Sequence, residues 1–273
     1  MGVIGITGAN GLLGRYLTQL EGCVPIQADV TDEIELSAAL RQVRPQAVIH
    51  CAAYTDVDGA EDAPIDALKT NLYGTALLAH RFKGRLIVLS TDYIFDGQDG
   101  PYDEAATPNP LGVYGMSKLA AEMAVAGRPD TLIVRTTILF GWHPAKPNFV
   151  TTVLGKLENH QPVALPDSIY GTPTYARDLS HALRFLASLV SHPTGVIHVV
   201  GPNLLSRLQF GKLIATTFGF SPELITPGRI SGRAKRPRKA GLQTIRLNQL
   251  RFTMSSTVTA LEHMKEDRQN HAI

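Results

Sequence analysis

Short apolar segments alternate along the chain with segments whose apolar residues recur every three or four positions. Segments 2–7, 23–27, 47–53, 85–91, 131–140 and 195–200 are apolar and predict β-strands. Segments 12–20, 33–43, 60–82, 111–126, 147–159, 174–190 and 206–218 are periodic and predict helices. Thr31 or Asp32 is expected to cap the second helix, which ends before Pro45.

This alternation predicts an α/β protein with a doubly wound parallel sheet of the Rossmann type, because its strands are apolar almost throughout and need helices on both faces. After residue 141 the pattern loosens and prolines become frequent, which indicates a smaller second domain. We expect a dinucleotide-binding domain over residues 1–140 plus about 171–192. A smaller, C-terminal substrate-binding domain is expected over residues 141–170 and 193–273.

Composition changes this picture little. The 273 residues are 44% hydrophobic and 18% charged, which is typical of a soluble globular protein, and the net charge of +2 indicates neither a nucleic-acid nor a membrane partner. Cys23 and Cys51 lie in apolar segments and are expected to be buried thiols. There is no signal peptide or membrane-length apolar stretch, so we expect a cytoplasmic protein. The nine histidines show no ligand spacing, and no catalytic metal is expected.

A glycine-rich turn follows the first predicted strand. Gly8, Gly11 and Gly14 are spaced three residues apart in "TGANGLLG", directly before the first helix. Glycines there allow a tight turn and the approach of a pyrophosphate to free backbone N–H groups. We therefore predict that residues 8–14 bind a dinucleotide; the residues concerned are Gly8, Asn10, Gly11, Leu12, Leu13 and Gly14. The alternative is a purely structural turn.

The second strand bears on the choice between NAD and NADP. A carboxylate at its end would hold the ribose 2′-hydroxyl of NAD, but Gln27 stands there. Arg15, just past the third glycine, is placed either to meet a 2′-phosphate or to be an ordinary solvated helix residue. NADP(H) is mildly favoured over NAD(H).

Tyr114 and Lys118 are four residues apart in a predicted helix and so share one of its faces. A free tyrosine has a pKa of about 10, and a nearby ammonium group lowers it toward the range of a general acid. The spacing alone is common by chance. Ser90, Thr91 and Asp92 add weight, because they end the strand 85–91 and ligands bind at that edge of a doubly wound sheet. A hydroxyl there can hold a substrate carbonyl against Tyr114.

A basic segment, "GRISGRAKRPRKAG", spans residues 228–241 and contains no acidic residue. It is either a solvated loop or a clamp for the diphosphate of a nucleotide-sugar substrate, with Arg229 and Arg233 as candidate ligands. Nucleic-acid binding is a third reading, although no aromatic platform accompanies the run.

Taken in order, several motifs resemble those of the RmlD-type extended short-chain dehydrogenases/reductases, the dTDP-4-dehydrorhamnose reductases and their relatives. They are the glycine turn, "DVTD" (29–32), "CAAYTDVDGAE" (51–61), "STDYIFDG" (90–97), "PYDE" (101–104), "NPLGVYGMSKLAAE" (109–122), "RTTILFG" (135–141) and "GTPTYARDLS" (171–180). The resemblance covers most of residues 1–200 and extends weakly to "RPRKAGL" (236–242).

The resemblance implies a Thr–Tyr–Lys active site at Thr91, Tyr114 and Lys118. Tyr114 would protonate a ketone, Thr91 would orient it, and Lys118 would hold down the tyrosine pKa and bind the nicotinamide ribose, while C4 of the nicotinamide delivers the hydride. It also implies cofactor contacts at Asp29, Val30, Cys51, Ala52, Ala53, Tyr54, Asn71 and Ser90, and substrate contacts at Thr91 and Asp92.

This chain departs from the family where Ile138 replaces a tryptophan that helps to wall the sugar site, although Trp142 lies nearby in sequence. The resemblance therefore predicts NAD(P)H-dependent reduction of a 4-keto nucleotide sugar, most simply as a dTDP-4-dehydrorhamnose reductase. The alternatives are another nucleotide-sugar epimerase or ketoreductase, and a non-catalytic NADP-binding regulatory subunit of methionine adenosyltransferase. A small-molecule substrate and a homodimer fit these readings.

Overall fold

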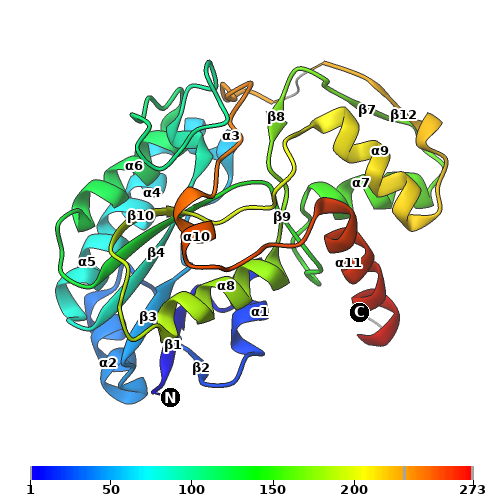
Figure 1. The fold of residues 1–273 in the computed structure, drawn as a ribbon. Coiled ribbons are helices and arrows are strands. Elements are labelled where there is room, and N and C mark those ends of the chain that lie inside the picture. The colour runs from blue at the N-terminus through cyan, green and yellow to red at the C-terminus, as the bar shows by residue number, and fades with distance from the viewer. Residues whose placement is uncertain (1, 230–231, 272–273) are drawn as a thin grey trace.

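A six-stranded parallel sheet forms the centre of the larger part of the molecule (Figure 1). The structure is a computed structural model and describes residues 2–229 and 232–271. The strand order is β10-β5-β4-β3-β1-β2. The strands are β1 (Ile4–Thr7), β2 (Cys23–Pro25), β3 (Ala47–His50), β4 (Arg85–Thr91), β5 (Thr131–Thr136) and β10 (Gly195–His198). The predicted doubly wound parallel sheet is confirmed.

Helices cover both faces of this sheet. On one face, α1 (Leu12–Thr18) and α8 (Ala176–Ser188) bury an apolar cluster with side chains of β1, β3 and β4. On the other, α2 (Glu33–Val43), α5 (Gly74–Arg81) and α6 (Val113–Val125) enclose a second cluster. Asp32 caps α2 as predicted, because its carboxylate accepts bonds from the amides of Ile34 and Glu35.

The single helix predicted over residues 60–82 is instead four consecutive elements: α3 (Val57–Asp62), α4 (Pro64–Leu68), the π-helical turn Lys69–Tyr73, and α5. Pro64 has no amide hydrogen and begins a new helix, and Ala63 before it is non-helical. The π-helical turn carries Asn71, whose amide side chain bonds outside the helix. Periodicity found the apolar face but not these two interruptions.

A smaller lobe lies beside the sheet and has its own apolar cluster. We use this name for α7 (Phe149–Glu158), β7 (Val163–Leu165), α9 (Arg207–Phe218), β12 (Ile225–Pro227) and α11 (Thr257–His271). β7 and β12 pair in parallel. The remaining short elements are β6 (Leu139–Phe140), β8 (Tyr170–Gly171), β9 (Thr174–Tyr175), β11 (Leu205–Ser206), α10 (Ile245–Gln249) and two 3-10 turns, Asp92–Ile94 and Pro222–Leu224.

The chain crosses between the two parts more often than the sequence indicates. β10 pairs with β5 in the main sheet, and Leu247 and Met254 pack in the cluster under α8. The expected boundary puts all of residues 193–273 in the smaller domain, so the structure differs from it for these segments. The reason is that β10 completes the edge of the sheet only after the chain has visited the smaller lobe.

Candidate active site

The three glycines of the turn differ in how much room their surroundings leave for a side chain. Gly8 has a φ of +64°, and a Cβ there would lie 2.6 Å from the amide nitrogen of Ala52. A Cβ on Gly14 would lie 2.2 Å from the carbonyl oxygen of Gly8. Gly11 is different, because its Cβ would meet only that same oxygen, at 3.2 Å. The protein thus needs glycine at positions 8 and 14 for its own packing, whereas position 11 is open.

The other predicted cofactor residues surround this turn. Leu13 is buried under the sheet and Asn10 is exposed. Asp29 lies on the surface after β2, where the backbone and side-chain hydrogen bonds from Thr31 hold the pKa of its carboxyl below the usual value. Cys51, Ala52, Ala53 and Tyr54 follow the carboxyl end of β3 and are partly buried. Burial raises the pKa of the Cys51 thiol to about 12, so it is not a nucleophile at neutral pH.

Asn71 ties the end of β3 to the helix that carries Tyr114. Its side chain accepts a bond from the amide of Tyr54 at 2.9 Å and donates to Ser117 Oγ at 2.8 Å. Ser117 Oγ in turn donates to the carbonyl oxygen of Tyr114 at 2.8 Å. Sequence reasoning named Asn71 but missed Ser117, whose place inside "YGMSK" was the available signal.

Thr91, Tyr114 and Lys118 come together at the carboxyl edge of the sheet. Thr91 ends β4, and Tyr114 and Lys118 occupy the first two turns of α6. The Thr91 hydroxyl lies close enough to the Tyr114 phenol to act on its pKa. The Tyr114 ring also contacts Tyr93, with ring centroids 5.6 Å apart. The spacing of the sequence motifs thus translates into contact at a strand end.

The protonation of this group differs from what the sequence suggested. Burial raises the pKa of Tyr114; the nearby Thr91 hydroxyl acts against it, and the charges of Asp92 and Tyr93 add to it. Lys118 is 6% exposed and donates to the carbonyl oxygen of Leu89 at 2.6 Å, and burial lowers its pKa to about 8. Burial is therefore the dominant influence on the Tyr114 pKa in this structure, and the expected lowering by Lys118 stays a prediction. Tyr114 is protonated, as a proton donor must be.

Below Lys118 lies a buried ion pair. Glu122, one turn further along α6, accepts bonds from Arg135 of β5 at 2.7 and 3.0 Å. Ser90 donates its hydroxyl to the same carboxylate. In this structure the Ser90 hydroxyl is bound to Glu122, and its expected contact with the cofactor stays a prediction. Neither Glu122 nor Arg135 was identified from the sequence.

On the substrate side, Asp92 is buried beside Thr91 and accepts a bond from Thr137 Oγ1 at 2.6 Å. Ile138 has a φ of +43°, which is unusual for a β-branched residue, and marks a sharp turn between β5 and β6. Trp142 does not take the place of the missing tryptophan, because its Nε1 donates to the carbonyl oxygen of Met264 at 2.6 Å and its ring packs on Phe218.

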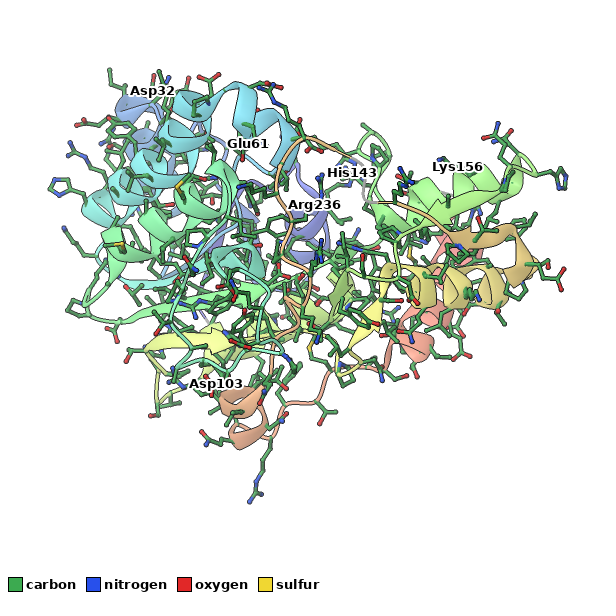
Figure 2. The ribbon with its side chains drawn as sticks, turned by 90° about the horizontal axis from the view of Figure 1, so that it is seen from above. Asp32, Glu61, Asp103, His143, Lys156 and Arg236 are labelled. Atoms are coloured by element: carbon green, nitrogen blue, oxygen red, sulfur yellow. The ribbon has the colours of Figure 1, made fainter. Side chains whose placement is uncertain are left out.

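The basic segment forms a strap, by which we mean residues 232–241. Seen from above, Arg236 lies on the strap between the two parts of the molecule (Figure 2). Arg236 pairs with Asp58 of α3 at 2.5 Å and also bonds Tyr93. Arg233 pairs with Asp62 on the surface, and Arg229 is exposed. Of the predicted ligands, Arg233 is thus engaged by an acid of this chain.

Arg207 was missed by the sequence reasoning. It begins α9, with its guanidinium carbon 4.8 Å from the centre of the Phe149 ring. Burial lowers its pKa, whereas the nearby Tyr93 and Asp92 act to raise it and Arg236 to lower it. Two arginines, from α9 and from the strap, therefore converge beside Tyr93. The available signal for Arg207 was its position in the first turn of the helix predicted over residues 206–218.

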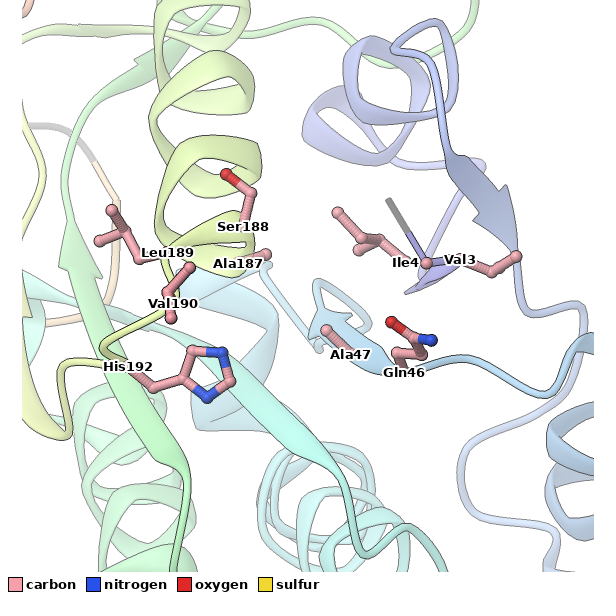
Figure 3. A pocket seen from close by; sticks show the side chains of 10 residues that line it. Val3, Ile4, Gln46, Ala47, Ala187, Ser188, Leu189, Val190 and His192 are labelled. Carbon is pink, nitrogen blue, oxygen red and sulfur yellow. The ribbon is translucent and has the colours of Figure 1, made fainter.

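The pocket in Figure 3 is not part of this site. It has a volume of about 280 Å³ and lies among the first residues of β1 and β3 and the end of α8. Those are the amino ends of the strands, opposite Thr91. Among the described residues there is no group of three or more potential metal ligands. None of the helices in residues 2–229 and 232–271 is long and apolar enough to cross a membrane.

Comparisons with known proteins agree with these motifs. A family model described as the RmlD substrate binding domain matches residues 2–269. A dTDP-4-dehydrorhamnose reductase from Mycobacterium tuberculosis is 37% identical over 240 residues, which cover 81% of this chain and 77% of the relative. Methionine adenosyltransferase 2 subunit beta from Danio rerio is 30% identical over 277 residues, 92% of this chain and 86% of that protein.

Among solved structures, a dTDP-4-dehydrorhamnose reductase from Bacillus anthracis in complex with NADP superposes with a TM-score of 0.91. It is 30% identical in sequence, and the match covers 98% of this chain and 100% of that one. The similarity includes both the sheet and the smaller lobe.

Proposed function

The chain belongs to the RmlD substrate binding domain family, and on this premise we propose that it reduces the 4-keto group of a nucleotide sugar with NADPH, with dTDP-4-dehydrorhamnose as the first substrate to test. We favour NADPH because the similar Bacillus anthracis structure holds NADP. In addition, no carboxylate stands at the end of the second strand, where one would bind the ribose 2′-hydroxyl of NAD. NADH remains the alternative.

The residues fit a dinucleotide. The bare backbone at Gly11, next to the two glycines needed for packing, leaves room for a pyrophosphate. The bound cofactor would supply the hydride from C4 of its nicotinamide. We propose that Asp29 and Val30 lie by the adenine end, and that Cys51 to Tyr54 line the middle of the cofactor. Lys118 would bind the nicotinamide ribose, and Asn71 would support the site.

Tyr114 would give its proton to the ketone oxygen, and Thr91 would hold that oxygen in place. The contact of the Thr91 and Tyr114 side chains at the end of β4 is the observation that carries this proposal. Because burial keeps Tyr114 protonated, it starts each turnover able to donate.

The test is Tyr114→Phe, which removes the proton donor and keeps the ring. Reduction followed by the absorbance of the reduced cofactor should fall by roughly 10²–10⁴-fold, while cofactor binding persists. Wild-type protein and Tyr93→Phe serve as controls, since the ring of Tyr93 meets that of Tyr114 edge to face and lies in the 3-10 turn after β4. A Tyr114→Phe protein with near-normal kcat would contradict the role.

Substrate binding is proposed to rest on Arg207 and Arg236, with Asp92 and Ile138 lining the sugar end. Arg229 and Arg233 stay predictions, and Arg41 in the last turn of α2 provides the matched control because its side chain is exposed and is no predicted ligand. Arg207→Ala should raise KM for the nucleotide sugar roughly tenfold or more, with a small change in kcat. Arg41→Ala should leave KM within about twofold of wild type. Equal KM values for all three proteins would show that Arg207 does not bind the substrate and only packs on the Phe149 ring.

The similarity to the zebrafish methionine adenosyltransferase subunit keeps a second function open. If the wild-type chain binds NADP but reduces none of a panel of nucleotide-sugar ketones, we propose a regulatory subunit instead. Co-purification with a methionine adenosyltransferase catalytic subunit would then decide.

A further inference from the structure

A buried carboxylate stands directly behind the two hydroxyls of the proposed active site. Asp92 is 3% exposed and follows Thr91 at the end of β4. Its oxygens accept bonds from Thr137 Oγ1 at 2.6 Å and from Thr91 Oγ1 at 3.2 Å. None of the ion pairs between described residues includes it. The proposed function does not use this group for chemistry.

The hydroxyl of Thr91 lies between that carboxylate and the phenol of Tyr114. It has a single hydrogen, and it also accepts a bond from the amide of Tyr93 at 3.3 Å. While Asp92 is ionised, it takes the Thr91 hydrogen. When Asp92 is protonated, it donates to Thr91, and the Thr91 hydrogen is free to turn toward Tyr114. The charge on Asp92 therefore sets the direction of the hydrogen bond.

We propose that Asp92 returns a proton to Tyr114 through Thr91 after each reduction. In this role Asp92 acts on Tyr114 through the Thr91 hydroxyl and not on the ketone itself. This inference rests on the proposed function. Reduction adds a hydride from the reduced dinucleotide to the ketone carbon and the Tyr114 proton to its oxygen. The phenolate then takes the proton of Thr91, Thr91 takes that of Asp92, and the Asp92 carboxylate takes one from water. The protein is unchanged, and one solvent proton is consumed.

The surroundings of Asp92 suit this exchange. Burial raises its pKa to about 6, while the bond from Thr137, the charge of Arg207 and the bond from Thr91 act to lower it. The groups that face it are Thr91, Thr137, Arg207, Tyr93 and Tyr114. Lys118 offers a rival route, since it lies one helix turn from Tyr114, but its ammonium is bound to the Leu89 carbonyl oxygen.

The experiment is a stopped-flow comparison of the wild-type protein and Asp92→Asn, which keeps the shape of the side chain and cannot pass on a proton. The resident Tyr114 proton serves the first turnover. With the nucleotide sugar at saturating concentration, the steady turnover of Asp92→Asn should therefore be roughly tenfold or more slower than its own first turnover, whereas the wild-type protein should show no such drop. A merely structural role would slow both phases alike.

Thr137→Val is the second variant, and it keeps the carboxylate. Loss of its hydrogen bond raises the pKa of Asp92, so the decline of steady-state turnover with rising pH should move to higher pH. Steady turnover of Asp92→Asn equal to wild type, or an unmoved profile in Thr137→Val, overturns the relay in favour of Lys118. A wild-type protein that reduces no ketone contradicts the proposed function instead.

Discussion

Lys118 and Asp92 are ionisable side chains that the fold places almost out of contact with water. Each ion loses hydration on burial, and a few hydrogen bonds replace it only in part. The pKa of Lys118 therefore falls to about 8 and that of Asp92 rises to about 6, both toward the neutral form. Groups that titrate near neutral pH exchange protons readily. Burial of Lys118 and Asp92 therefore suits them to proton transfer, and it also lowers the free energy of unfolding.

The free energy of unfolding that the protein loses by burying the ionised Asp92 carboxylate should be measurable. Its pKa of about 6 lies above the ordinary value of 3.8, so the folded protein holds the extra proton between these values. Stability should fall as pH rises through that window and then stay level. Asp92→Asn should gain up to about 3 kcal/mol of unfolding free energy relative to wild type between pH 4 and pH 8. Urea unfolding at several pH values measures it, and a difference that does not change with pH contradicts it.

At the scale of elements, the sequence predicted each strand of the main sheet because buried parallel strands carry runs of apolar residues, as in residues 86–89 of β4. It also placed Thr91, Tyr114 and Lys118, since strand ends and helix starts follow from the same periodicity. It did not predict the division of residues 57–81 into α3, α4, the π-helical turn and α5. Pro64 causes the first break, whereas the π-helical turn accompanies the bond between Asn71 and Tyr54, which are distant in sequence. Arg207 was missed because convergence with the strap is a property of tertiary structure.

The glycine turn separates folding from cofactor binding within one element. Gly11→Ala places its Cβ 3.2 Å from a single carbonyl oxygen, so the thermal midpoint should shift little while NADPH affinity falls. Gly14→Ala would meet backbone atoms at 2.2 and 2.6 Å and should lower both. Thermal unfolding with and without NADPH distinguishes the two. Unchanged NADPH affinity in Gly11→Ala would falsify the assignment of this turn.

At the scale of the whole molecule, the strap follows β12 of the smaller lobe and is bound to α3 and to the loop after β4 of the larger part. Asp58 accepts bonds from the amides of Arg233 and Ala234 at 2.8 Å each and from the Arg236 guanidinium. The bond from Arg236, with those amides, lowers the pKa of Asp58 to about 2, so this anchor stays ionised at any working pH. On its other side, the strap bonds Gly97 and Tyr102 in the loop after β4.

Asp58→Ala should release the strap from α3. We expect faster trypsin cleavage within residues 232–241 and a higher KM for substrate, because Arg236 loses its partner. Asp62→Ala is the matched control, since its pair with Arg233 is exposed and worth at most about 1 kcal/mol. Cleavage rates that rise equally in both variants would show that Asp58 has no special part in holding the strap.

The late return of the chain to its first sheet has a consequence for biosynthesis. When residue 140 leaves the ribosome, five of the six strands exist, but α8, β10, Leu247 and Met254 do not. One apolar face of the sheet, covered at that point only by α1, then waits about fifty further residues for α8 and more than a hundred for Leu247 and Met254, on the order of ten seconds of translation. During that interval the nascent protein presents a partly uncovered hydrophobic surface, and its sheet edge stays open until β10 is made. The organisation that brings two lobes around one active site thus makes the unfinished chain a natural client for chaperones.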